Sequence, residues 1–78
     1  MDEKDLLSRI ERDPEIMFGK PVIKGTRLPA DLIMEKLAHG YTEEALKKEY
    51  PFITGDDIKA VMLFAAKVLS LETEFSTT

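Results

Sequence analysis

The chain has 78 residues, a net charge of −4 at neutral pH, one histidine and no cysteine. A chain of this length forms one small domain that buries only about 60% of its unfolded surface, so a second subunit would add to its stability. Its composition excludes disulfides, thiolate metal sites and multi-histidine metal centres, and no apolar run approaches the roughly 18 residues of a membrane span.

The N-terminal region gives mixed signals. Residues 1–4 are polar and are predicted to be frayed. Residues 5–12 fit either a short helix or the approach to a strand at residues 9–12. Asp13-Pro14 then predicts a turn. Because the N-terminus is acidic and lacks the pattern of a signal peptide, we expect a cytoplasmic protein.

Residues 19–30 form a basic segment in this acidic chain, with three cations and no acid: Lys20, Lys24 and Arg27. Gly19 and Gly25 are expected at turns, because glycine adopts positive φ without steric cost. The β-branched pair Val22-Ile23 lies between them and predicts a short strand. Since Pro21 lacks an N–H, this strand is expected to begin there or to lie at an edge. The segment is therefore predicted to be a hairpin-like arm.

Three helices are predicted after the arm. The first begins at Pro29 or Ala30 and ends at His39, before a helix-ending glycine. The second follows the N-cap Thr42 and is short, because Pro51 disfavours helical geometry in the residue before it. The third covers residues 54–71 with Thr54 as N-cap and spans about 25 Å.

Apolar residues at helical spacing predict the buried face of the first and third helices. In the first helix these are Ala30, Ile33, Met34, Leu37 and Ala38. In the third they are Ile58, Val61, Met62, Ala65, Val68 and Leu69. Further apolar residues lie off the second stripe, so the third helix is expected to have two burial partners: the domain itself, and either the arm or another chain.

We therefore predict one domain over residues 1–78, with a β-arm at about 8–28, a trihelical core at 29–71 and a polar tail at 72–78. The fold class is mainly α: a three-helix, helix-turn-helix (homeodomain-like) bundle preceded by a short β-arm or hairpin.

The basic segment also carries a resemblance. The run Gly-Lys-Pro-Val-Ile-Lys-Gly-Thr-Arg-Leu-Pro, preceded by Asp-Pro-Glu-Ile and followed by His-Gly-Tyr-Thr-Glu-Glu and Tyr-Pro-Phe-Ile-Thr, resembles the domain of unknown function 433 family. The likeness covers about residues 8–69. It implies a small, antitoxin-like protein with a helix-turn-helix core, and it favours the strand around residues 9–11. It also implies pairing with a small PIN-like nuclease toxin.

Four basic residues are candidates for contact with DNA: Lys20, Lys24 and Arg27 in the arm, and Lys59 in the third helix. The arm could follow a DNA backbone, or form a ribbon with a dimer mate. The alternative is a purely structural or dimer-forming element, with Arg27 paired to Asp31. Asp56 and Asp57 argue against the third helix as a recognition helix, because they would face phosphates.

Catalysis is not expected, nor is a metal ion or another cofactor. His39 precedes a helix-ending glycine, where an exposed cap residue is usual, and the paired acids at helix N-termini are explained by the helix dipole. Two functions remain open. One is a homodimeric, antitoxin-like, DNA-binding regulatory protein, and the alternative is a protein-interaction or assembly domain with no nucleic-acid role.

Overall fold

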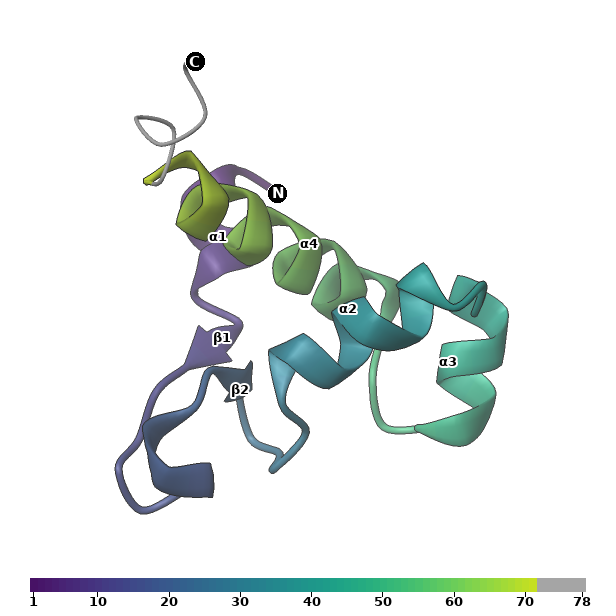
Figure 1. Ribbon diagram of the computed structural model, residues 1–78, viewed down its shortest axis with the longest axis horizontal. Helices are drawn as coiled ribbons and strands as arrows, with labels where there is room; N and C mark the ends of the chain where they lie inside the picture. The colour runs from purple at the N-terminus through teal and green to yellow at the C-terminus, as the bar shows by residue number, and fades with distance from the viewer. Residues whose placement is uncertain (72–78) are drawn as a thin grey trace.

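The computed structural model describes residues 1–71, and the predicted polar tail at 72–78 lies outside them. The elements are, in chain order, α1 (Glu3–Leu7), β1 (Ile10–Glu11), the 3-10 turn η1 (Met17–Gly19), β2 (Val22–Ile23), α2 (Ala30–Ala38), α3 (Glu43–Glu49) and α4 (Gly55–Ser70). The protein is mainly helical, with a short antiparallel hairpin near its N-terminus. Figure 1 shows α1 beside the C-terminal part of α4, the hairpin at one end of the molecule and α3 at the other. No helix within residues 1–71 is long and apolar enough to cross a membrane.

The three predicted helices are confirmed as α2, α3 and α4, and their ends follow from local capping. Thr42 Oγ1 accepts a hydrogen bond from the Ala45 N–H at 3.1 Å, which fixes the start of α3. At the start of α4, Thr54 Oγ1 accepts from the Asp57 N–H at 3.2 Å while the Asp57 carboxylate accepts from the Thr54 N–H at 2.9 Å. This reciprocal capping box satisfies two N–H groups at once.

The prediction of frayed residues 1–4 is wrong, because α1 begins at Glu3. Asp2 caps it by accepting a hydrogen bond from the Asp5 N–H at 2.8 Å. A five-residue helix is too short to be stable alone, so its order comes from packing on α4, with an ion pair of 3.0 Å between Glu3 and Lys67. The ambiguous residues 5–12 therefore contain the end of this helix and then the strand β1.

The predicted strand at Val22-Ile23 is confirmed as β2. It pairs antiparallel with β1, Ile10 opposite Ile23 and Glu11 opposite Val22. Both β2 side chains are buried, so the strand belongs to the core and only the turns of the arm project from the body. Figure 1 shows the hairpin leading through the connection after β2 directly into α2.

The core lies between β2 and the facing sides of the three long helices. Its largest fully buried side chains are Val22, Ile23, Ile33, Leu46, Ile58 and Val61. Four residues predicted on buried faces are exposed instead: Ala38, Met62, Val68 and Leu69. Val68 and Leu69 are exposed because α2 and the hairpin cover mainly the N-terminal half of α4 (Figure 1). Ala38 is the last residue of α2, and Met62 lies on a side of α4 that faces solvent.

Lys36 joins the C-terminal end of α2 to α3. Its ammonium donates to Glu49 Oε1 at 2.8 Å and lies 4.6 Å from the centre of the Tyr41 ring and 5.8 Å from that of Tyr50. The hydrogen bond from Lys36 lowers the pKa of the Glu49 carboxyl below its ordinary value, and the same bond raises the pKa of Lys36.

The low pKa of Glu49 predicts a pH-dependent contribution to stability. A carboxyl whose pKa is lower in the folded state stabilises the fold above its unfolded pKa, here 4.5, and the effect fades as pH falls through the folded-state pKa. We expect Glu49→Gln to lower Tm at pH 7 and to match the wild type in strong acid. The control is Glu44→Gln, an exposed acid of α3 with no ion pair within residues 1–71. A Tm difference that does not vary with pH would contradict this expectation.

Candidate nucleic-acid interface

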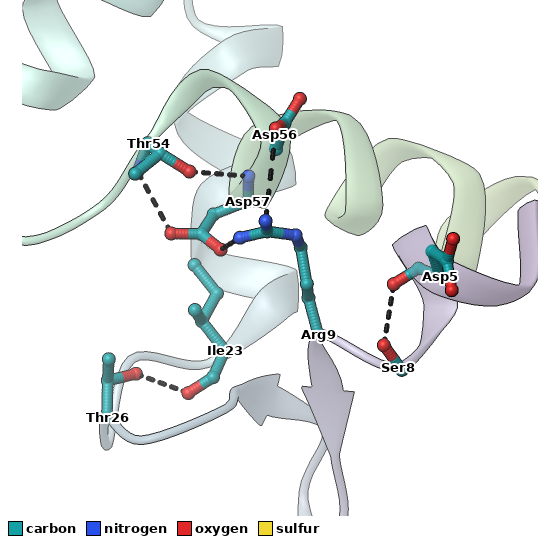
Figure 2. A network of polar contacts seen from close by, with 8 residues as sticks. All are labelled: Asp5, Ser8, Arg9, Ile23, Thr26, Thr54, Asp56 and Asp57. Atoms are coloured by element: carbon teal, nitrogen blue, oxygen red, sulfur yellow. Dashed lines mark hydrogen bonds and ion pairs between the residues drawn. The ribbon is translucent and has the colours of Figure 1, made fainter. Parts of the chain in front are cut away.

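The turn that follows β2, residues 24–27, is held in place by its own side chain and backbone. Thr26 Oγ1 donates to the Ile23 carbonyl at 2.7 Å, which Figure 2 shows, and accepts from the Leu28 N–H at 3.0 Å. Gly25 has a φ of +81°, the left-handed region expected from the sequence. A fixed turn of this kind presents its two basic side chains, Lys24 and Arg27, on a rigid support.

Lys24 and Arg27 line the same open surface groove, of about 780 Å³, together with Glu11, Ile16, Gly25, Thr26 and Phe52. Both cations are exposed, and neither has an ion-pair partner in the part of the chain that the structure describes. Glu11 is only half-buried, and one of its carboxylate oxygens accepts from the Gly25 N–H at 3.3 Å. Two cations against one carboxylate leave the groove with a net positive charge.

An aromatic ring borders the same groove. Phe52 is 59% exposed, and its ring meets the ring of Tyr50 edge-on with centroids 6.1 Å apart. Phe52 lies in the link between α3 and α4, and nothing in its local sequence indicates a position beside the basic turn. Exposed rings next to cations are a usual feature of surfaces that bind single-stranded nucleic acids.

The other two candidates lie elsewhere. Lys20 forms an ion pair of 2.9 Å with Asp31 and lines a different groove. The sequence had offered Arg27 as the partner of Asp31, and the structure gives that place to Lys20. Lys59 is exposed on α4 two positions after Asp57, so it points to nearly the opposite side of the helix from the Asp57–Arg9 contact. The structure therefore brings Lys24 and Arg27 together and separates Lys20 and Lys59 from them.

Arg9 is the main residue that the sequence did not single out. Figure 2 shows its guanidinium reaching the N-terminal end of α4, 3.0 Å from Asp57 Oδ1 and 3.9 Å from Asp56 Oδ2. Its carbonyl accepts from the Lys24 N–H at 2.7 Å. Arg9 thus ties the basic turn to α4. Arg9 and Asp57 are 48 positions apart in the sequence, so no local pattern indicates that they pair.

His39 is the exposed C-cap residue of α2, as its place before Gly40 suggested. Its N–H donates to the Glu35 carbonyl at 3.1 Å, which is an ordinary helix-terminal role. Within residues 1–71, no three histidine or acidic side chains come together in a way that could hold a metal ion.

Comparison with known proteins gives three findings. The model of the family "Protein of unknown function (DUF433)" matches residues 10–65. The uncharacterized protein y4eO of Sinorhizobium fredii is 27% identical over 56 residues, which are 72% of this chain but 25% of that protein, so the chain spans about a quarter of that relative. The crystal structure of a DUF433 member protein from Anabaena variabilis superposes with a TM-score of 0.75 at 21% identity, over 95% of this chain and 74% of that one, and has the same fold. The match over most of its length means that this chain belongs to the DUF433 family.

Proposed function

We propose that the protein is a small homodimeric regulatory module that binds DNA through Lys24 and Arg27. The observation that carries the proposal is that these two exposed cations lie on one rigid turn, without an acidic partner within residues 1–71, beside the exposed ring of Phe52. DNA contacts of this kind are made to phosphates, so they set affinity rather than sequence preference.

The overall charge of −4 limits this binding to a local contact. With two phosphate contacts for each subunit, a dimer makes about four, and the logarithm of the affinity should fall against the logarithm of salt concentration with a slope of about −3.6. We therefore expect about a 150-fold loss of affinity between 50 and 200 mM salt. Fluorescence anisotropy on the DNA upstream of the gene measures this, and the absence of binding at 50 mM salt would remove DNA from the proposal.

The family resemblance adds a second partner to this proposal. In an antitoxin-like role, the protein also binds a PIN-like nuclease, whose basic RNA-binding surface would attract an acidic chain. The net charge of −4 supports this part. Co-expression of the chain with an adjacent nuclease gene, followed by purification at several salt concentrations, tests it. A nuclease that stays fully active with excess protein would contradict it.

A protein-interaction or assembly domain with no nucleic-acid role is the second candidate. Exposed apolar side chains near the C-terminal end of α4 favour it, because Leu69 is 66% and Leu71 79% exposed. The two candidates differ in one result. A DNA-binding module binds DNA at low salt. An assembly domain binds no DNA under the same conditions but still forms a stable complex with another protein chain.

A further inference from the structure

We propose that two copies of this chain assemble by exchanging Phe18, so that each ring enters the apolar groove beside α2 and α4 of the other copy. This inference rests on the homodimer of the proposed function and assigns residues to its interface. Two observations carry it: a fully exposed aromatic ring, and an apolar groove close to it along the chain.

Phe18 is held outward by the backbone. Its side chain is 100% exposed, and both it and Met17 have left-handed backbone angles, with φ of +58° and +50°. Such angles are unfavourable for residues that carry a Cβ. The turn is nevertheless closed by hydrogen bonds from the Gly19 N–H to the Ile16 carbonyl and from the Lys20 N–H to the Met17 carbonyl. A strained turn that displays a large apolar ring is typical of a contact surface.

The groove that we assign to the ring has a volume of about 370 Å³. Its lining is mostly apolar and includes Pro21, Met34, Phe64, Val68 and Leu69. Val68 is 39% and Leu69 66% exposed, so this wall of the groove is open to a partner. These are also residues of α4 that the sequence predicts to be buried.

Charge favours a second copy as the occupant. The groove is bordered by Lys20 and Asp31, one cation and one anion whose side chains lie 2.9 Å apart. A two-fold interface brings the same patch of both subunits together, and a patch with both signs can meet a copy of itself without repulsion. A strongly basic or acidic partner would gain no attraction from this neutral border.

Position and area agree with this assignment. Phe18 is two residues before Lys20, at most about 7 Å along the chain, so the ring lies close to the groove of its own subunit. A single two-fold axis can therefore place each ring in the groove of the other subunit. One exposed phenylalanine presents about 200 Å², and an exchange covers two rings and two groove surfaces, about 800 Å² in total. Met17, which is 36% exposed, adds a little to this, so the interface lies below about 1,200 Å², in the range of weak and reversible complexes.

Cysteine cross-linking tests the exchange directly, because the chain has no cysteine of its own. The double variant Met17→Cys/Val68→Cys, which keeps the Phe18 ring, should form a covalent dimer under mild oxidation, at least ten times faster than either single variant. A matched control pair, Met17→Cys/Lys48→Cys, uses an exposed residue of α3 and should react at the slower rate. Equal rates for the two pairs would overturn the proposal.

Sedimentation velocity gives the second readout. The wild type should be a dimer at 100 μM, Phe18→Ser a monomer, and Phe52→Ser, which changes another exposed phenylalanine, still a dimer. Because Phe18 makes no contact in its own core, the circular dichroism spectrum should not change. A monomeric wild type, or a dimeric Phe18→Ser, would overturn the exchange. Failure of all dimeric forms to bind DNA would instead overturn the proposed function and leave this interface standing.

Discussion

Replacing Arg9 with alanine should lower the free energy of unfolding by about 3 kcal/mol. Removing one partner of a buried ion pair leaves an uncompensated charge and typically costs 3–5 kcal/mol, and the partial exposure of Arg9 puts this case at the lower end. Asp57, the partner, is only 8% exposed, and it already accepts the Thr54 N–H of the capping box. A domain of this size has a total stability of about 4–12 kcal/mol, so the loss would be a large share.

Urea denaturation followed by circular dichroism measures this effect. The control is Lys67→Ala, which removes the ion pair to Glu3, in which both side chains are more than half exposed. Exposed pairs of this kind contribute about 0–1 kcal/mol. If Arg9→Ala were no less stable than Lys67→Ala, the tie between the basic turn and α4 would have no energetic importance.

Replacing Lys24 and Arg27 together with alanine should reduce DNA affinity at least about 200-fold at 50 mM salt. Each phosphate contact at that salt concentration contributes about 15-fold through released counterions, so the loss of two contacts from one subunit gives about 200-fold, and the loss from both subunits of a dimer gives more. The fold should be unaffected, because both side chains are exposed and make no ion pair within residues 1–71.

The matched control is Lys48→Ala/Lys59→Ala, which changes the net charge by the same amount on other surfaces. Both lysines are exposed, on α3 and α4. If the loss came from net charge alone, the two double variants would bind DNA equally weakly. We expect the control to retain most of the wild-type affinity, and a loss as large as that of Lys24→Ala/Arg27→Ala would contradict the assignment.

The sequence allowed the helices and turns of this fold to be predicted because their signals are local. Thr42 and Thr54 cap the helices that follow them, and Gly25 and Gly40 have the positive φ that ends a strand or a helix. In each case the partner groups lie within a few residues. Hydrophobic spacing also identified Ile33 and Val61 as core residues.

The remaining features depend on distant residues. Helix α1 is ordered by its contact with α4, and Arg9 pairs across 48 residues with an acid that seemed a mere cap residue. Spacing pointed to Arg27, four residues before Asp31, as the partner of that acid, and only the path of the arm selects Lys20. For Phe18, no pattern predicts a left-handed backbone at a residue other than glycine or asparagine.

The central claim is that the turn at residues 24–27, and not the start of α4, is the DNA contact. Amide chemical-shift mapping of the isotope-labelled protein, titrated with a short duplex at 50 mM salt, tests it at every residue. We predict the largest shift changes at Lys24, Gly25, Thr26 and Arg27, with little change at Lys59. If the largest changes fell instead on the first turn of α4, as for a recognition helix, the claim would be contradicted.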